Sequence, residues 1–365
     1  MSEKLFFLTT RGLEAVSANE IATLPAVTLG SIGYRRITAS CVGSLAPLLD
    51  LRTIDDVFLD LSTWRDIGRH RRTLAFMREL SSLLDLRAAA SKVARLRDIP
   101  QSPAFSVTAN FVGKRNYGAE EVKSAVCDGI VTYHDWRYTD DDGAADLNVR
   151  VFIEGETAFV GLRLGGRPLH DREYKKAHIA GSLKPPVAAA MLRLVGIAPG
   201  QSLLDPCCGA GTILAEAEGF GAGGLGAGGF GAGEFGAGVW GADIDKSAVS
   251  AARLNVDAAG IDAIIKVWDA RALPIPNHSI DRVVSNLPWG RQSPISGDLA
   301  LFYRDVCAEM RRVLAPGGRI ALLTNAPRLA VFRDLRCDNR LEISLYGQTP
   351  TILTFSRDGN NKSAP

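Results

Sequence analysis

The stretch that decides the fold is Leu204-Asp205-Pro206-Cys207-Cys208-Gly209-Ala210-Gly211-Thr212, which follows a short apolar run and precedes a helical one. Its two glycines allow a sharp backbone turn that can approach a ligand without a clash from a Cβ atom. The spacing is G-x-G, with Asp205 four residues before the first glycine, whereas dinucleotide-binding proteins show G-x-G-x-x-G. The stretch therefore predicts a strand–loop–helix turn that binds a ligand other than a pyrophosphate.

The residues around this turn alternate between strand-like and helix-like patterns. Helices are expected at Ser247–Ala259 and Asp298–Leu314, and apolar strands at Ser202–Asp205, Val239–Asp243, Ile264–Trp268, Ile280–Ser285 and Arg319–Thr324. Such alternation predicts an α/β domain with a doubly wound, Rossmann-like parallel sheet. At its end, Leu341–Tyr346 and Thr351–Phe355 flank turn residues and predict an antiparallel hairpin.

Acidic residues follow three of the predicted strands. Asp243 can accept hydrogen bonds from both ribose hydroxyls of an adenosine, and Asp269 from the adenine amino group. Of the two acids in this segment we choose Asp243 for the ribose, and Asp245 could instead cap the helix that starts near Ser247. A single acid at a strand end is often only a cap, but together with Asp205 these acids suit a cationic adenosine compound. The set predicts S-adenosylmethionine as the cofactor, which leaves as S-adenosylhomocysteine.

The segment Asn286-Leu287-Pro288-Trp289-Gly290 follows the strand predicted at Ile280–Ser285. The lone pair of an exocyclic base amine is delocalised into the ring, so an enzyme must hold that lone pair toward the methyl group. The side-chain oxygen of Asn286 and a neighbouring backbone carbonyl can accept the two N–H groups, and Trp289 can stack on the base. The alternative is an ordinary turn with a buried tryptophan. We assign the catalytic role to Asn286, Leu287, Pro288 and Trp289.

The amino-terminal half has a mixed strand and helix pattern, which predicts an α+β module. Strands are expected at Leu5–Thr9, within Val27–Ile37, at Ala104–Val112 and within Leu147–Leu164. Helices are expected at Leu13–Leu24, Val42–Leu49, Leu74–Leu86, Leu86–Leu96 and Ala119–Tyr133, and after the module at Pro185–Val195. We place a ferredoxin-like part at residues 1–62, a second domain at 63–165, a linker at 166–184 and the Rossmann-like domain at 185–358.

Two further segments stand out by composition. Residues 219–238 contain tandem five-residue repeats of the type Phe-Gly-Ala-Gly-Gly, which predict an insert at the sheet edge away from the cofactor, rather than a phosphate loop. Residues 359–365 predict a disordered tail. The linker is rich in basic residues, and it either contacts RNA or cofactor or serves as a solvated connector.

The composition excludes several classes of protein. Hydrophobic residues make up 46% and charged residues 22% of the 365-residue chain, as in globular proteins, and the net charge is +2. None of the six cysteines forms a C-x-x-C pair, and no histidine lies beside them at the spacing of metal ligands. No metal site is therefore expected. No apolar run approaches a membrane span. We expect a cytoplasmic protein, without membrane or metal, that acts as a monomer.

The sequence resembles the THUMP-domain RNA guanine-N2 methyltransferases. The resemblance lies in Asp205–Thr212 and Asn286–Gly290, and extends to Phe6–Glu14, to Phe105–Asn110 with Gly113, Lys114 and Asn116, to Gly166–His170 and to Ser182–Pro185. Cys207, where the family usually has a larger apolar or aromatic residue, and the glycine repeats depart from the family pattern. The resemblance implies a THUMP module before the methyltransferase domain. It also implies cofactor contacts from Asp205, Cys208, Gly209, Gly211, Thr212, Asp243, Ile244, Asp269, Ala270, Asn286 and Lys184.

The same resemblance implies a tRNA (guanine-N2-)-methyltransferase. The relatives that the sequence resembles most modify guanosine 6 in the tRNA acceptor stem, while the THUMP module grips that stem and the CCA end. Residues expected to contact RNA phosphates are Arg69, Arg71, Arg72, Lys114, Arg115, Arg167, Arg172 and Lys175. For any one of these, the alternative is a side chain that only solvates a helix, because charge alone does not distinguish the two roles.

Three alternatives stay open. The same chemistry could act on guanosine 10 of tRNA or on ribosomal RNA, because the choice of target depends on domain geometry. A non-catalytic RNA-binding protein could use the fold only as a scaffold, although the glycine turn and Asn286–Trp289 count against this. A protein-glutamine methyltransferase, which shares a motif like that at Asn286, is disfavoured by the RNA-binding half.

Overall fold

A computed structural model describes residues 2–221, 238–289 and 298–357. The chain divides into two compact units. The first comprises the residues up to Thr9 together with Ser17–Leu169, and the second comprises Thr10–Val16 together with the residues from His170 onward. The second unit begins within the predicted linker at 166–184.

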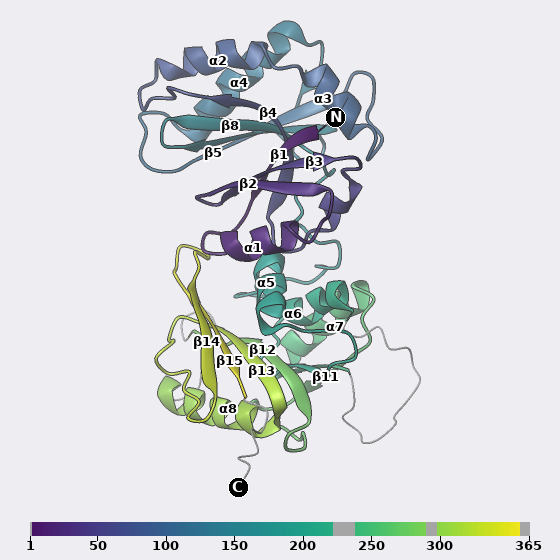
Figure 1. Ribbon diagram of the computed structural model, residues 1–365, viewed down its shortest axis with the longest axis vertical. Helices are drawn as coiled ribbons and strands as arrows, with labels where there is room; N and C mark the ends of the chain where they lie inside the picture. Colours follow the sequence, from purple (N-terminus) through teal and green to yellow (C-terminus); the bar gives the residue numbers. More distant parts are fainter. Residues whose placement is uncertain (1, 222–237, 290–297, 358–365) are drawn as a thin grey trace. The chain divides into compact units, whose positions relative to one another are not determined.

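The first unit is built on an eight-stranded sheet of order β2-β3-β1-β4-β8-β7-β5-β6. Its strands are β1 (Ser2–Leu8), β2 (Val27–Gly33), β3 (Arg36–Val42), β4 (Asp56–Trp64), β5 (Ala104–Phe111), β6 (Arg137–Tyr138), β7 (Leu147–Glu154) and β8 (Thr157–Arg163). Between them lie α1 (Glu14–Ile21), η1 (Ala46–Asp50), α2 (Thr73–Ser82), α3 (Leu86–Val93) and α4 (Ala119–Tyr133). Helices α2 and α4 lie side by side over one face of the sheet (Figure 1).

Strand β4 was not expected from the sequence, and it joins the two predicted parts of this unit. It pairs antiparallel with β1 on one side and with β8 on the other. The boundary placed between residues 62 and 63 falls inside β4, so the ferredoxin-like part and the second domain share one sheet. Alternate residues of the strands, such as Val57 and Leu59, enter the core beneath the helices. The segment expected as a helix at Val42–Leu49 is instead the end of β3 and the 3₁₀ turn η1.

The second unit is built on a seven-stranded sheet of order β11-β10-β9-β12-β13-β15-β14. The strands are β9 (Leu203–Asp205), β10 (Val239–Asp243), β11 (Ala263–Val267), β12 (Ile280–Asn286), β13 (Leu314–Thr324), β14 (Arg336–Glu342) and β15 (Thr351–Ser356). The first five pair in parallel, and β15 runs antiparallel to β13 and β14. The predicted Rossmann-like sheet with an antiparallel hairpin is confirmed.

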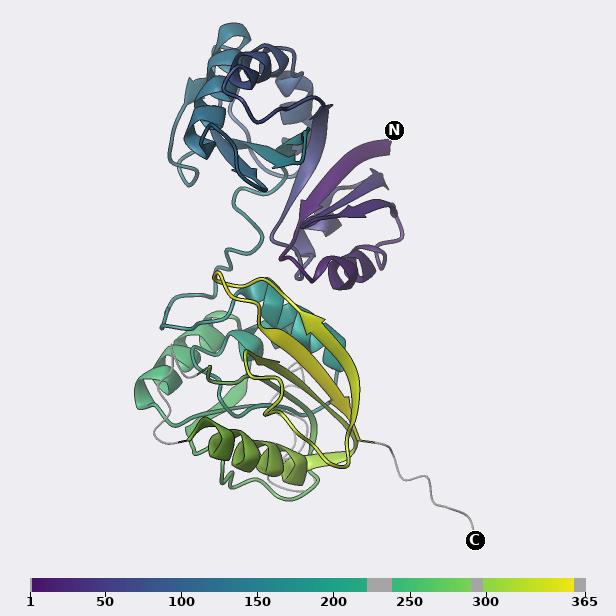
Figure 2. The same ribbon diagram turned by 90° about the vertical axis from the view of Figure 1, so that its left-hand side faces the viewer.

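Helices cover both faces of this sheet. On one face lie α5 (Pro185–Val195), α6 (Thr212–Glu216), the short turn η2 (Ala217–Phe220) and α7 (Lys246–Ala258), and on the other lies α8 (Leu299–Val313) (Figures 1 and 2). Helix α5 begins with two prolines, whose missing N–H groups cost nothing in the first turn. It ends at Gly196, which has a φ of 66°. The central strands β9 and β10 are covered on both faces and are buried along most of their length, whereas the edge strand β14 is polar and largely exposed.

The first strand of the carboxyl-terminal hairpin lies earlier in the chain than predicted. Strand β14 covers Arg336–Glu342, earlier in the chain than the predicted Leu341–Tyr346, and residues 343–350 form the connection to β15. Most of the glycine-rich insert, residues 222–237, and the predicted tail at 359–365 lie outside the described residues. In the part of the chain that is described, no helix is both long and apolar enough to cross a membrane.

Candidate active site

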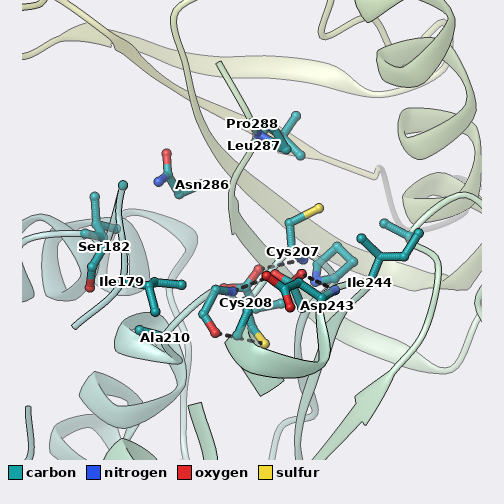
Figure 3. A pocket seen from close by; sticks show the side chains of 18 of the residues that line it. Ile179, Ser182, Cys207, Cys208, Ala210, Asp243, Ile244, Asn286, Leu287 and Pro288 are labelled. Carbon is teal, nitrogen blue, oxygen red and sulfur yellow. Dashed lines mark hydrogen bonds between the residues drawn. The ribbon is translucent and has the colours of Figure 1, made fainter. Parts of the chain in front are cut away.

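A cavity of about 450 Å³ opens in the second unit where β9, β10 and β12 end. This is the carboxyl edge of the parallel strands, where ligands bind in doubly wound folds. The glycine turn, the ends of β10 and β12, and the segment 179–183 line the cavity, and their side chains surround it in Figure 3. Asp205, Asp243 and Asn286, which the sequence singled out, all lie at this edge.

The glycine turn adopts the conformation that its sequence predicts. Gly209 and Gly211 have φ angles of 52° and 73°, a region that residues with a side chain rarely enter. A Cβ atom on Gly211 would lie 3.0 Å from the Cα atom of Ala252. Gly211 is therefore required for the close approach of α6 to α7, and it is not among the residues that line the cavity.

Asp205 lies beneath the glycine turn and is 1% exposed. Its carboxylate accepts hydrogen bonds from the Ser285 hydroxyl at 2.7 Å and from the Cys207 amide at 3.1 Å. Burial raises the pKa of Asp205 to about 7, although the bond from Ser285 acts in the opposite direction. Burial also raises the pKa values of Cys207 and Cys208 well above their usual range, so both are neutral thiols. A cation placed in the cavity would favour the ionised form of Asp205.

The acids after β10 and β11 also lie on the cavity wall. The Asp243 carboxylate accepts from the Gly209 amide and from the Asp245 amide, each at 3.0 Å, and so links β10 to the glycine turn. Asp245 caps α7, as the sequence suggested. The Asp269 carboxylate forms a bidentate ion pair with Arg271, and this lowers its pKa. Arg271 lines the cavity too and was not expected from the sequence.

All four residues of the segment Asn286–Trp289 line the cavity, but they differ in how far their side chains are buried. The Asn286 side chain is half-buried on the cavity wall, and Trp289 lines the cavity while also packing against the core of this unit. The Leu287 side chain is 1% exposed and belongs to the core below α8. Only its backbone is therefore suited to the role that the sequence suggested. Gly290 lies outside the described residues.

The backbone of this segment is held by a buried tyrosine. The Tyr303 hydroxyl from α8 donates to the Pro288 carbonyl at 3.3 Å and bonds to the Thr324 hydroxyl at 2.6 Å. Tyr303 is fully buried, and burial raises its pKa to about 12, so the hydroxyl stays protonated as a donor. The segment is thus fixed to α8 and to the end of β13.

Four cavity-lining side chains carry buried polar atoms that have no hydrogen-bond partner among the described residues. These atoms are Ser182 Oγ, Thr212 Oγ1, Asn286 Oδ1 and Trp289 Nε1. Buried polar groups in folded proteins are normally satisfied, and exceptions call for an explanation such as a missing ligand. The cavity volume also falls in the range of small-molecule sites. The residues present therefore fit a polar ligand of cofactor size.

One wall of the cavity comes from residues 179–183, which the sequence placed in the linker. The side chain of Asn255 in α7 binds both the amide and the carbonyl of Ala177, and donates to the Ala210 carbonyl of the glycine turn at 2.8 Å. Lys175 donates to the Leu183 carbonyl at 2.6 Å, and burial lowers its pKa. The linker is therefore part of the second unit and not a solvated connector at this point.

Some predicted residues do not line the cavity. Lys184, expected to contact the cofactor, is the N-cap residue of α5 and is not among the lining residues. Cys208, Gly209, Thr212, Ile244 and Ala270 do line it, as expected. No group of residues suited to a metal ion occurs in the described ranges.

The residues expected to contact RNA fall into two groups. Arg69, Arg72, Lys114 and Arg167 are exposed, and Arg71 is exposed while forming an ion pair with Glu121. The others bond within the protein: Arg115 donates to the carbonyls of Ile67, Gly68 and Gly155 and to the Tyr117 hydroxyl, and Arg172 pairs with the buried Glu216 at 3.0 Å. Lys175 has the bond to Leu183 already described. The side chains of the second group therefore make contacts within the protein, which their positive charge alone did not indicate.

Sequence reasoning assigned no role to Asn255, Tyr303 or Tyr346, and it noted Ser182 only as part of the resemblance. Asn255 gave a signal, because it is a polar residue on the face of α7 that also carries the buried Ala252 and Val256. Tyr303 and Tyr346 gave none, because they act through partners distant in the sequence.

Two protein-family models match separate parts of the chain. A model of the THUMP domain matches residues 81–163, and a model of the RMKL-like methyltransferase domain matches residues 172–340. The tRNA (guanine(6)-N2)-methyltransferase of Thermus thermophilus is 33% identical over 227 residues, which are 62% of this chain and 63% of that relative. The match thus spans less than two thirds of that relative's length.

Solved structures agree with these matches. TrmN from Thermus thermophilus superposes with a TM-score of 0.73 at 26% identity, over 98% of this chain and 100% of that one. SMU.472 complexed with SAH superposes with a TM-score of 0.72 at 15% identity, over 99% of both chains, which shows the fold alone. Residues 81–163 therefore match a THUMP domain and residues 172–340 an RMKL-like methyltransferase domain, in agreement with the resemblance seen in the sequence.

Proposed function

We propose that the protein transfers a methyl group from S-adenosylmethionine to the exocyclic N2 amine of a guanosine in tRNA, at position 6 of the acceptor stem. The products are N2-methylguanosine and S-adenosylhomocysteine. The observation that carries this proposal is Asn286, whose Oδ1 is buried without a partner among the described residues in the same cavity as the glycine turn. A buried acceptor of this kind is matched to an N–H donor of a substrate.

The residues around the cavity suit each part of the cofactor. Asp243 and Asp269 are acceptors for the ribose hydroxyls and the adenine amine, while Cys208, Ile244 and Ala270 supply apolar surface near them. Ser182 and Thr212 offer unpartnered hydroxyls to the amino-acid end, and Asp205 supplies a carboxylate. When bound, S-adenosylmethionine supplies an electrophilic methyl group on a cationic sulfonium.

The chain's part in the reaction is to orient the amine. Asn286 Oδ1 accepts one N–H of the guanine amine, and the backbone carbonyl of Leu287 or Pro288 accepts the other. With both N–H groups held, the nitrogen lone pair is directed toward the methyl group, which is catalysis by orientation. Trp289 stacks on the base and holds it outside the RNA helix. No strong base is needed, because the methylated ammonium is acidic enough to lose its proton.

Several features support tRNA as the substrate. The first unit contains a THUMP domain, and the relative aligned above is named a tRNA methyltransferase that acts on guanine 6. Arg69, Arg72 and Lys114 of this unit are exposed and suited to phosphates. We extend the proposal to a cytoplasmic monomer that holds the acceptor stem and the CCA end of tRNA.

Mass spectrometry of nucleosides tests this function. Unmodified tRNA is incubated with the protein and labelled S-adenosylmethionine, digested, and analysed, and the modified position is mapped by comparing fragments. Labelled N2-methylguanosine at position 6 is expected. Label at guanosine 10, or label only in ribosomal RNA, would replace the proposed target. Cofactor binding without any transfer to RNA would favour a non-catalytic RNA-binding role.

A further inference from the structure

Tyr346 lies at the tip of a very tight turn between β14 and β15. The amide of Leu345 donates to the Gln348 carbonyl and the amide of Gln348 donates to the Leu345 carbonyl, each at 3.0 Å. The two residues between them, Tyr346 and Gly347, have φ angles of 52° and 74°. A two-residue hairpin turn with both central residues at positive φ is of type I′, whose usual sequence is Asn-Gly, Asp-Gly or Gly-Gly.

A tyrosine is unfavourable at this position of the turn. Residues with a bulky side chain adopt the left-handed region only at a cost, which asparagine and glycine largely avoid. The turn is also pinned from outside, because the Asn325 side chain at the end of β13 donates to the side-chain oxygen of Gln348. The fold therefore places the tyrosine side chain in a fixed direction that the turn itself does not require.

The direction of that side chain is toward the cavity. Tyr346 is one of the lining residues, and its hydroxyl donates to the Ser182 carbonyl at 3.0 Å. With the far end of the ring bound in this way, the residue is still 53% exposed. An aromatic face that is both accessible and immobilised is suited to stack on a base, since little side-chain freedom remains to be lost.

The order of strands shows which part of the cavity Tyr346 serves. The acids matched to the adenosine follow β10 and β11, on one side of β12, whereas Tyr346 belongs to the β14–β15 hairpin on the other side. Asn286 at the end of β12 stands between them in this order. The hairpin therefore borders the cavity on the side of Asn286 away from those acids. In the function proposed above, this side is left for the methyl acceptor.

We propose that Tyr346 forms an aromatic wall for the substrate nucleotide and stacks on a base of the RNA. This inference rests on the function proposed above and adds a substrate contact from the carboxyl-terminal hairpin to those of Asn286 and Trp289. The wall is supplied by the ring, and the bond to Ser182 only steadies it.

Three variants separate the possible roles. Tyr346→Asn removes the ring and installs a residue that favours the turn, Tyr346→Phe keeps the ring without its hydroxyl, and Val331→Asn removes an exposed apolar side chain that does not line the cavity. For each, the melting temperature, the dissociation constant of S-adenosylhomocysteine by calorimetry, and kcat and KM for tRNA are measured.

The proposal expects a selective loss in Tyr346→Asn. Its kcat/KM for tRNA falls roughly tenfold or more, as for the loss of a stacked base, while its melting temperature is unchanged or raised and its affinity for S-adenosylhomocysteine is unchanged. Tyr346→Phe retains most of the activity, and Val331→Asn matches the wild type.

Other results overturn it. Wild-type activity in Tyr346→Asn shows that the ring contacts no substrate, and equal losses in Tyr346→Phe and Tyr346→Asn show that the hydroxyl matters instead of the ring. A weaker affinity for S-adenosylhomocysteine places the ring in the cofactor subsite. In each of these cases the wild-type protein still methylates tRNA and the proposed function stands, whereas a wild-type protein that methylates no RNA overturns both.

Discussion

Asn286 is the residue on which the chemistry depends, because it combines a buried unpartnered acceptor with a place at the end of β12. Asn286→Ala is expected to lower kcat by about 10²–10³-fold, the usual cost of removing one oriented hydrogen-bonding group from an active site. Single-turnover methylation of tRNA measures this rate. The dissociation constant of S-adenosylhomocysteine is the control and should change little. A variant that loses cofactor affinity but keeps its single-turnover rate contradicts the role.

Asp205 should make the free protein sensitive to pH. The pKa of Asp205 is about 7 in the folded state and near 4 in the unfolded chain. Its contribution to the free energy of unfolding is therefore fully present below about pH 4 and is lost as the pH rises to about 7. Asp205→Asn keeps the acceptor for Ser285 and Cys207 but cannot ionise. Relative to wild type, it is expected to gain on the order of 3 kcal/mol in unfolding free energy between pH 4 and pH 8, measured by urea denaturation.

The same residue links cofactor affinity to pH. Besides burial, the negative charge of Asp243 also raises the pKa of Asp205. Burial and the charge of Asp205 in turn raise the pKa values of Cys207 and Cys208, so the two thiols stay neutral through this range. A cationic ligand requires the ionised carboxylate, so the dissociation constant of S-adenosylmethionine should rise as the pH falls below about 7. This slope should be absent in Asp205→Asn. Parallel profiles for the two proteins would exclude Asp205 from this role.

At the scale of elements, α7 is the part that joins the linker to the glycine turn. Asn255→Ala removes three hydrogen bonds to Ala177 and Ala210 and leaves these backbone groups buried without their partner. We expect a loss of about 2–4 kcal/mol in unfolding free energy and a weaker affinity for S-adenosylhomocysteine, because two walls of the cavity lose their common support. Asn339→Ala, which removes a single bond to Thr354, is the matched control and should cost less than half as much.

How well the elements could be predicted depends on how local their determinants are. Helices α4 and α5 have the bounds that their periodicity and their prolines indicated, and β10 has the bounds of its apolar run. Strand β4 escaped prediction because its sequence, Asp-Val-Phe-Leu-Asp-Leu-Ser-Thr-Trp, has no clear boundary and is stabilised by pairing with β1 and β8. The turn at Tyr346 was misassigned as strand because tyrosine carries no turn signal.

For the whole molecule, we expect substitutions of exposed basic residues to weaken RNA binding, and substitutions of basic residues with partners inside the protein to lower stability instead. Replacing Arg69, Arg72 and Lys114 together by alanine should weaken tRNA binding and reduce the slope of log K against log salt by roughly 0.7–0.9 for each phosphate that is no longer neutralised. The melting temperature should stay unchanged, because all three side chains are exposed. Filter binding over a range of salt concentrations measures the slope.

Arg115→Ala is the matched comparison for these variants. Its guanidinium bonds to the loops at Ile67–Gly68 and Gly155 and to Tyr117, so its loss should lower the melting temperature of the first unit. A triple variant with an unchanged salt slope would show that the phosphates bind elsewhere. If the Arg115→Ala protein keeps the stability of the wild type but loses affinity for RNA, then Arg115 contacts RNA as the sequence suggested.

The glycine turn, the acids at the strand ends and the segment at Asn286 could be read from the sequence, because each is encoded within about ten consecutive residues whose spacing reflects backbone geometry. Only the tertiary structure decided that Asn255 holds Ala177 and that Tyr346 reaches Ser182, residues 78 and 164 positions apart. Contacts of this kind depend on which buried polar groups the packed chain leaves facing each other, and no local pattern records that outcome.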